Sequence, residues 1–464
     1  MLNLYDTATG QIRELAMRDP GTVSIYVCGP TVYGPPHLGH GRATLVYDIL
    51  RRYLEWTGLH VRHVSNITDI DDKIIERANR EDRPWQDITH KCENVWWKAM
   101  DSMDVLRPTD VPHATAYVEQ MVEMIGQIVD IGRGYVTDDG VYLSVRSIED
   151  YGLLAHQKLD DMLPGGGERE LVGAEHKHDP ADFAMWKLSK PGEPSWPSPW
   201  GAGRPGWHSE CVVMSLDLLG EGFDLHAGGQ DLKFPHHENE RAQAVALDKT
   251  FANHWMHHAF VVDGEGEKLS KSLGNFTNLL DLTDTMDPRS YRLLLLQSHY
   301  RSPVSVNPET IGAAERALAG IDTFVRRATA FLSVAEPAVV ADPAVVADPA
   351  VLAAFRERMD DDLDTANALA LVFDAARRGN AAIDADDTSA VGVALATVNE
   401  LTGAVGLLLK ADVDEIPAEA SAKAAALDAA RAAKDFASAD TLRGELLADG
   451  WIVETTKAGT TIRK

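Results

Sequence analysis

The stretch TVSIYVCGPTVYGPPHLGH, residues 22–40, carries the pattern from which the fold class follows. Its first six residues are mainly β-branched or aromatic and stop at Cys28-Gly29-Pro30, which predicts a buried strand that ends in a loop. Residues 43–58 then place apolar side chains at every third or fourth position and close with a glycine, which predicts a helix. Residues 60–72, HVRHVSNITDIDD, predict a second strand that runs into a polar turn. This order predicts an α/β fold with a Rossmann-like parallel sheet, whose ligands lie beyond the carboxyl ends of the strands.

The chain has 464 residues, which is too long for one hydrophobic core. A hairpin-like stretch, YVTDDGVYLSV, and a Gly-, Pro- and Trp-rich stretch interrupt the sheet pattern and predict an insertion. From residue 308 the sequence becomes helical and Ala-rich, and a six-residue repeat with prolines over residues 337–354 predicts a loop between helices. We therefore predict a sheet domain in two halves, an insertion, a loop region, an all-α helical bundle and a small C-terminal domain. Their predicted boundaries are 1–107 and 201–262 for the two halves, 108–200 for the insertion, 263–307 for the loop region, 308–412 for the bundle and 413–464 for the C-terminal domain.

Composition limits the compartment and the partners. The 44 basic and 71 acidic residues give a net charge of −27, so any contact with nucleic acid requires a local basic surface. The sequence shows no secretion signal and no run of about 18 apolar residues, so we expect a cytoplasmic protein without a membrane span. The three cysteines lack CxxC spacing, which argues against a disulfide framework. Cys92, on a predicted helix, is expected to be a small buried apolar residue.

The sequence HLGH places two histidines where the first helix begins. Backbone N–H groups at a helix start favour phosphate, and His37 and His40 add donors to the same loop. Gly39 between them allows a base or a ribose to approach the backbone closely. Two histidines at this spacing also occur by chance, so HLGH alone identifies no function.

A second polar stretch, KLSKS, follows the glycine-containing loop DGEG. Lys268 and Lys271 on such a loop can neutralise the charge that develops when pyrophosphate leaves a triphosphate. The alternative is a pair of solvated surface lysines.

The stretch FPHHENE, residues 234–240, holds two histidines and two glutamates after the small-residue turn HAGGQD. The histidines are adjacent rather than one helical turn apart, which excludes the HExxH pattern of zinc proteases. Whatever this cluster binds therefore needs residues from elsewhere in the chain.

Taken together, HLGH and KLSKS on an α/β chain resemble the paired signatures of the class I aminoacyl-tRNA synthetases. Six further stretches are similar to the cysteinyl-tRNA synthetase family: CGPTVYGPPHLGHGR, SNITDIDDKI, DPADFAMWK, RPGWHSEC, HAGGQDLKFPHHENE and KSLGNF. The resemblance covers nearly the whole chain and is weakest over residues 311–430. It implies a ligase that uses ATP to activate L-cysteine and transfers it to tRNA(Cys). It also implies that the loop region contacts the tRNA stem, that the bundle binds tRNA and that the C-terminal domain reads the anticodon.

The same resemblance implies a zinc site. Its ligands would be Cys28, Cys211, His236 and Glu240, with His237 and Glu238 around the ligands or at the surface. Two thiolates, an imidazole and a carboxylate suit zinc, which can accept one more thiolate. An apolar pocket separates cysteine from serine or alanine by only about 1–3 kcal/mol, whereas roughly ten-thousand-fold selection needs about 5.5 kcal/mol. A bond between zinc and sulfur could supply the difference, although two buried apolar cysteines are the alternative.

Other roles are implied by resemblance alone. Thr68 and Trp207 would line the amino-acid pocket, His208 and His226 would surround the ligand, and Asp231 would bind the ribose hydroxyls of ATP. Trp207 as ordinary core packing is the alternative. His37, His40, Lys268 and Lys271 would act in catalysis, binding ATP together with Gly39 and Asp231, while Mg²⁺ would accompany the pyrophosphate.

The sequence departs from the family pattern at three positions and leaves two rival functions. Leu38 and Leu269 replace isoleucine and methionine in the signatures, and Ile462 stands where the family often has tryptophan, which puts a stacking contact with the anticodon in doubt. The rivals are the related ligase that joins cysteine to an aminosugar inositol in mycothiol synthesis, and a non-catalytic RNA-binding relative. The tail KDFASADTLRGELLADGW favours tRNA over the sugar acceptor, and the two signatures favour an enzyme. We expect a monomer.

Overall fold

The computed structural model describes residues 1–161, 176–262, 278–335, 346–411, 417–456 and 459–463. They form two compact units, one of residues 1–319, 346–375 and 396–408 and the other of residues 320–345, 376–395 and 409–464. The bounds of the six predicted segments remain a prediction. No helix within the described ranges is long and apolar enough to cross a membrane.

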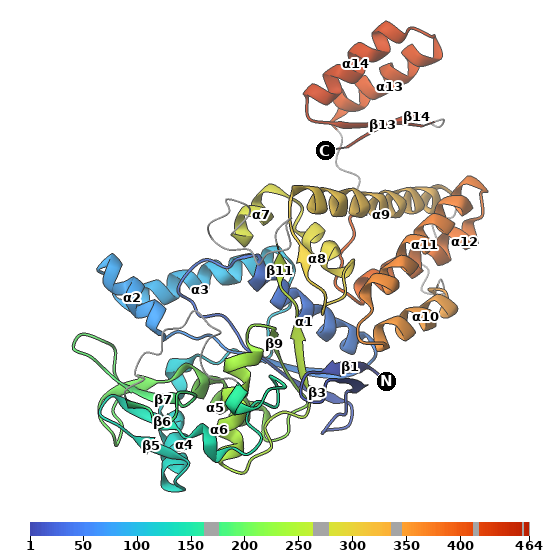
Figure 1. Ribbon diagram of the computed structural model, residues 1–464. Helices are drawn as coiled ribbons and strands as arrows, with labels where there is room; N and C mark the ends of the chain where they lie inside the picture. Colours follow the sequence, from blue (N-terminus) through green and yellow to red (C-terminus); the bar gives the residue numbers. More distant parts are fainter. Residues whose placement is uncertain (162–175, 263–277, 336–345, 412–416, 457–458, 464) are drawn as a thin grey trace. The chain divides into compact units, whose positions relative to one another are not determined.

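A four-stranded parallel sheet forms the centre of the first unit (Figure 1). Its strands are β3 (Thr22–Val27), β4 (His60–Ser65), β9 (Leu225–Gly229) and β10 (Trp255–His258), in the order β10-β9-β3-β4. Val27 pairs with Ser65 on one side and with Ala227 on the other, so these strands end at the same edge. Helix α1 (Leu38–Trp56) connects β3 to β4. The parallel α/β sheet predicted from residues 22–72 is confirmed, and α1 begins inside HLGH, the stretch predicted to open the first helix.

A second, antiparallel sheet follows in sequence. It consists of β5 (Gly134–Val136), β6 (Gly140–Leu143), β7 (Phe183–Leu188) and β8 (Gly203–Pro205), after helix α4 (Val118–Asp130). The hairpin predicted from YVTDDGVYLSV is the β5–β6 pair. Strand β8 lies beyond residue 200, where the insertion is predicted to end, and leads directly into helix α5 (Trp207–Leu219).

Further strands and helices of the first unit precede, connect or follow the parallel strands in sequence. The N-terminal hairpin pairs β1 (Asn3–Asp6) with β2 (Gln11–Glu14), and two short strands, β11 (Val261–Val262) and β12 (Val304–Ser305), pair in parallel. The helices are α2 (Asp72–Glu81), α3 (Trp85–Ser102), α6 (Glu238–Ala246), α7 (Leu279–Thr285) and α8 (Pro288–Leu296). Cys92 is buried on α3, 4% exposed, as expected.

Helices dominate the chain after residue 307. They are α9 (Pro308–Ala335), α10 (Pro349–Asp360), α11 (Thr365–Asp384) and α12 (Thr388–Gly403). Helices α13 (Ala418–Ala432) and α14 (Phe436–Ala448) then pack with the hairpin of β13 (Ile452–Thr456) and β14 (Gly459–Arg463) around a core of their own. Ile462 is buried in that core.

The loop predicted over residues 337–354 is wrong at its C-terminal end. Helix α10 begins at Pro349, and the side chain of Asp348 accepts a hydrogen bond from the backbone of Ala350 at 2.9 Å. Aspartate at the N-cap followed by proline at the first helical position starts a helix as readily as it interrupts one. Residues 336–345 of the repeat lie outside the described residues.

Candidate functional site

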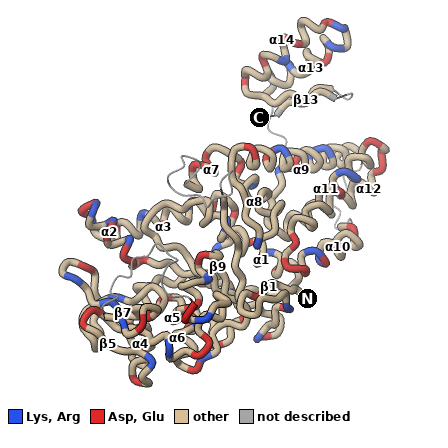
Figure 2. Tube along the Cα trace, viewed as in Figure 1, with Lys and Arg blue, Asp and Glu red and all other residues tan. Residues whose placement is uncertain are grey.

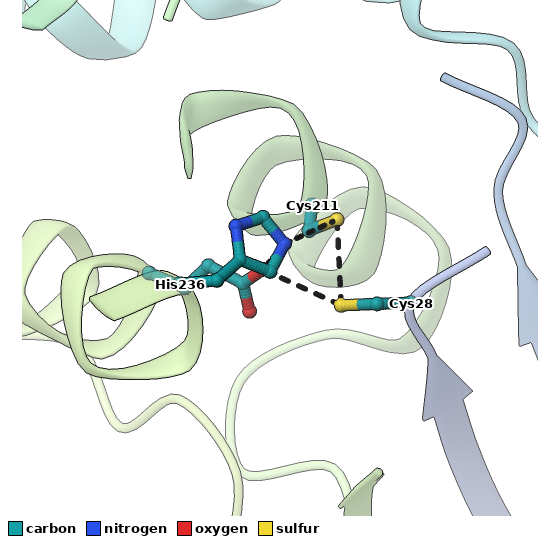
Figure 3. A group of neighbouring side chains, drawn as sticks. Cys28, Cys211 and His236 are labelled. Carbon is teal, nitrogen blue, oxygen red and sulfur yellow. Dashed lines mark hydrogen bonds and ion pairs between the residues drawn. The ribbon is translucent and has the colours of Figure 1, made fainter. Parts of the chain in front are cut away.

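Four side chains meet at the carboxyl edge of the parallel sheet, and Figure 3 shows three of them, Cys28, Cys211 and His236. Cys28 directly follows β3, Cys211 lies on α5, His236 lies in the turn before α6, and Glu240 lies in the first turn of α6. The two Sγ atoms are 3.6 Å apart, and Cys211 Sγ lies 3.8 Å from His236 Nε2. Glu240 Oε1 is 3.4 Å from Cys28 Sγ and 2.6 Å from His236 Nε2. We refer to these four residues as the thiol cluster.

Glycines allow the segments that carry the thiol cluster to come together. A Cβ atom at Gly29, beside Cys28, would lie 1.7 Å from the carbonyl oxygen of Asn66. A Cβ at Gly206, which precedes α5, would lie 2.0 Å from the carbonyl oxygen of Ala184. Real Cβ atoms do not approach this closely, so both positions require glycine for backbone contact.

The donor atoms of the thiol cluster fit a zinc ion. Tetrahedral coordination with Zn–S of about 2.3 Å and Zn–N or Zn–O of about 2.0–2.1 Å separates two sulfurs by about 3.8 Å and a sulfur from nitrogen or oxygen by about 3.5 Å. The three distances that involve sulfur, 3.6, 3.8 and 3.4 Å, agree with these values. The 2.6 Å between His236 Nε2 and Glu240 Oε1 is that of a hydrogen bond and is shorter than the about 3.3 Å of two such zinc ligands, so these two side chains would separate slightly to bind the ion. All four donor atoms lie within 4.8 Å of one another, and three of the four residues are buried.

A second group of possible ligands shares two members with the first. Cys28 and Glu240 also lie within 4.8 Å of His226 and His237. A histidine that binds zinc normally donates its other ring N–H to a partner. His226 Nδ1 is buried without such a partner among the described residues, while its Nε2 lies 2.5 Å from Glu240 Oε2. His226 is therefore better suited to orient Glu240 than to bind metal, which favours the thiol cluster.

Residues predicted to line the amino-acid pocket surround His236. The Trp207 ring stacks on the imidazole of His236 with centroids 3.9 Å apart and planes 19° apart. His208 Nδ1 lies 2.9 Å from His236 Nδ1 in a buried hydrogen bond. This bond engages Nδ1 of His236 and leaves Nε2 directed at Cys211 and Glu240. The two neighbours thus hold the ring of His236 in one plane, with Nε2 facing the other candidate ligands.

His237 and Glu238 were expected either around the ligands or at the surface. The second possibility is wrong, because both side chains are completely buried. His237 Nε2 lies 3.3 Å from Cys28 Sγ, and its Nδ1 bonds to His257 Nε2 at 2.8 Å. Glu238 accepts a hydrogen bond from the backbone N–H of Leu154 at 2.8 Å, which joins α6 to the segment between β6 and β7 of the second sheet. The stretch FPHHENE therefore points its polar side chains inward from a turn that packs closely on β9.

Sequence reasoning missed Glu210. Its carboxylate is 1% exposed and accepts a hydrogen bond from the hydroxyl of Thr68 at 2.8 Å. Burial, reinforced by the neighbouring Cys211, raises the pKa of Glu210 well above its usual value. Thr68, predicted to line the amino-acid pocket, is thus placed beside the thiol cluster through Glu210. The signal in the sequence was an acidic residue directly before a candidate metal ligand.

The charges of the thiol cluster suit a cation. Burial and then the neighbouring Cys211 and Glu240 raise the pKa of Cys28 well above its usual value. Burial also opposes ionisation of Glu240, but His236 and His226 outweigh it and lower its pKa well below the usual value. Burial opposes a charge on His236 as well, yet Glu240 and Cys211 raise its pKa to about 10. The raised pKa values keep protons on Cys28 and His236, which offset the negative charge of the cluster. A divalent metal would displace these protons and take over that role.

The two HLGH histidines form the start of α1. His37 Nδ1 accepts from the backbone N–H of His40 at 3.3 Å, and His40 Nδ1 accepts from the N–H of His37 at 3.1 Å. The rings stack with centroids 3.7 Å apart. Burial, with smaller effects from His37 and Lys73, lowers the pKa of His40 to about 3. His40 is therefore neutral, and because Nδ1 is an acceptor its hydrogen sits on Nε2, where it can be donated.

Of the other residues predicted to bind ATP, the structure describes Asp231 and Gly39. Asp231 is exposed just after the carboxyl end of β9, and a Cβ at Gly229 would lie 2.5 Å from its Oδ1. A Cβ at Gly39 would lie 3.0 Å from the His37 ring. Lys268 and Lys271 lie outside the described residues.

Comparisons with known proteins agree with this architecture. Residues 14–316 match the family described as "tRNA synthetases class I (C) catalytic domain", and residues 354–410 match the DALR domain. The chain is 42% identical to a cysteine–tRNA ligase of Streptomyces avermitilis over 474 residues, which cover 99% of this chain and 98% of that one. It is 42% identical to a cysteine–tRNA ligase of Halorhodospira halophila over 475 residues, with full coverage of both chains.

Solved structures share the fold at low sequence identity. Methionyl-tRNA synthetase of Mycobacterium tuberculosis in complex with methionyl-adenylate superposes with a TM-score of 0.60 at 14% identity, covering 83% of this chain and 90% of that one. A second structure of that synthetase bound to methionyl-adenylate gives a TM-score of 0.62 at 15% identity, with coverage of 83% and 91%.

Proposed function

The chain belongs to the cysteine–tRNA ligase family of class I aminoacyl-tRNA synthetases, and we propose that it selects its amino acid with a zinc ion held by the thiol cluster. The enzyme is a ligase that joins cysteine to tRNA with the use of ATP. The observation that carries the zinc proposal is the convergence of Cys28 and Cys211 to 3.6 Å at the carboxyl edge of the sheet. When bound, zinc supplies a coordination position that a substrate sulfur fills well and a serine hydroxyl fills poorly.

The residues around the thiol cluster hold the amino acid in this proposal. Trp207 and His208 keep His236 in one orientation, and His226 orients Glu240 through the 2.5 Å contact with its Oε2. The hydroxyl of Thr68 is held by its hydrogen bond to Glu210. A preorganised set of ligands avoids reordering side chains at the moment of binding.

Activation of the amino acid takes place beside the start of α1 in this proposal. The cysteine carboxylate attacks the α-phosphorus of ATP, and pyrophosphate leaves. His37 and His40 donate from Nε2 to phosphate oxygens, Lys268 and Lys271 neutralise the leaving group, and Asp231 accepts from the ribose hydroxyls. Mg²⁺ accompanies the phosphates. The cysteinyl group then passes from the adenylate to the terminal ribose of tRNA(Cys).

The helical region provides the surface for tRNA in this proposal. Figure 2 shows basic positions on α9 among the acidic ones, on a chain whose net charge is −27. Local basic positions of this kind are what a polyanion requires on an acidic protein. We place the enzyme, as a monomer, in the cytoplasm with its tRNA.

Charging of unfractionated tRNA with radiolabelled cysteine tests the proposal. We expect charging that requires ATP, is lost with a zinc chelator and returns when Zn²⁺ is added back. Transfer to an aminosugar inositol but not to tRNA would support the mycothiol-type ligase instead. Failure of cysteine to stimulate exchange between ATP and pyrophosphate would support a non-catalytic relative.

A further inference from the structure

Two residues directly after HLGH make contacts that the proposed mechanism does not use. Arg42 is 1% exposed on α1, and no acidic side chain among the described residues forms an ion pair with it. Its guanidinium instead donates to three backbone carbonyls, those of Phe260 at 2.5 Å, Tyr300 at 2.9 Å and Ser302 at 2.6 Å. Burying a charge without a counter-charge is costly, and an apolar side chain would fill the same space at lower cost. The three hydrogen bonds to carbonyls are therefore what the arginine contributes at this position.

Gly41 allows an equally close contact on the other side of the same turn. A Cβ atom at residue 41 would lie 2.8 Å from Leu279 Cδ1 and 3.0 Å from Tyr291 Cε1. Both neighbours are completely buried, so neither can move away into solvent. The hydroxyl of Tyr291 also donates to the carbonyl of Leu38 at 2.7 Å.

The structure describes the chain up to residue 262 before KLSKS and again from residue 278 after it. The contacts of Gly41 and Arg42 hold both of these ends against the first turn of α1. Before KLSKS, Phe260 precedes β11, which ends at Val262. After it, the backbone N–H of Leu279 at the start of α7 donates to the carbonyl of Pro36 at 2.9 Å. Val261, Leu279 and Leu38 belong to one core cluster. In Figure 1, α7, α8 and β11 lie around the start of α1.

We propose that Gly41 and Arg42 are positioning residues for the activation step, because they set the location of the HLGH histidines relative to the two chain ends that lead into and out of KLSKS. This inference rests on the proposed function of the two signatures. Phosphate stabilisation depends on donors from both signatures meeting one ligand, and a misplacement of about 1 Å can slow such a reaction by about 100-fold. None of these contacts involves a residue of the thiol cluster.

The test separates the two chemical steps in the full-length enzyme. Gly41→Ala adds the Cβ that meets Leu279 and Tyr291, and Arg42→Lys keeps a positive charge but cannot reach three carbonyls. We expect both variants to slow cysteine-dependent ATP–pyrophosphate exchange, by about 100-fold for Gly41→Ala, through kcat rather than through KM for cysteine. Single-turnover transfer of cysteine from preformed adenylate to tRNA, which involves no pyrophosphate, should keep its rate.

Two control variants account for ordinary structural effects. Gly126→Ala places a Cβ on helix α4 where no atom lies within 4 Å, and Arg52→Lys changes a partly buried arginine of α1 that bonds to Asp48 and Asp104. Thermal unfolding of all four variants measures loss of stability. Equal slowing of both chemical steps, or rates for Gly41→Ala and Arg42→Lys that match their controls, would overturn the inference. Absence of exchange in the wild-type enzyme would contradict the proposed function itself.

Discussion

Replacing Cys211 by alanine should weaken the binding of cysteine by about 100- to 1,000-fold while leaving the affinity for ATP nearly unchanged. In the proposed zinc site, the substitution removes one of two sulfur ligands and with it the selective contact to the substrate thiol. An apolar pocket would retain only about 1–3 of the roughly 5.5 kcal/mol that selection requires, so about 2.5–4.5 kcal/mol is lost. Cysteine and ATP dependence of pyrophosphate exchange, together with the zinc content of the purified protein, measures the effect.

Cys92→Ala is the matched control for this variant. Cys92 is also a buried thiol, 4% exposed, but it packs in a separate cluster with Ile88 and Ala78. The Cys92→Ala variant should keep the zinc content and the KM for cysteine of the unchanged enzyme. Comparable losses for cysteine and ATP in Cys211→Ala would show that the substitution damaged the whole domain.

The second large effect is expected at His40, where kcat should fall while the KM for cysteine stays the same. His40→Asn keeps a side-chain acceptor near the position of Nδ1, which caps α1, and removes the distal N–H donor. Loss of one preorganised donor to the reacting phosphate should lower kcat for activation by about 100- to 1,000-fold. The KM for cysteine and the zinc content should not change, because the thiol cluster is formed by other elements.

His40→Gln provides the comparison for His40→Asn. Glutamine can place an N–H near the position of Nε2, so it should retain more of the activation rate than asparagine does. Steady-state pyrophosphate exchange at saturating cysteine measures both variants. Equal rates for asparagine and glutamine would contradict a role for the distal N–H.

The sequence predicted those elements whose stability depends on local patterns. The run 22–27 becomes β3 with the same bounds, because a strand buried on both faces is mainly apolar and β-branched. The polar Ser24 within it is tolerated because its N–H and hydroxyl both donate to Asp224. The repeat 337–354 was misjudged at Asp348 and Pro349, since the same two residues favour a loop or a helix start and only tertiary packing decides between them.

The site was less accessible to sequence reasoning because its contacts are long-range. Cys28 and Cys211 are 183 positions apart, and no spacing rule brings them together without the resemblance to a known family. The contact of His237 with His257 depends on how the FPHHENE turn packs on β9, where a Cβ at Gly228 would lie 2.8 Å from the His237 ring. Glu210 was overlooked because a single carboxylate beside a cysteine is common in exposed helices.

Zinc K-edge X-ray absorption of the purified enzyme tests the central claim most directly. The thiol cluster predicts two sulfur neighbours at about 2.3 Å in the free enzyme, a third sulfur when cysteine is added, and no third sulfur with serine. One sulfur in the free enzyme would instead fit the group of Cys28, His226, His237 and Glu240. A sulfur count that stays at two with saturating cysteine would contradict selection through a metal–sulfur bond.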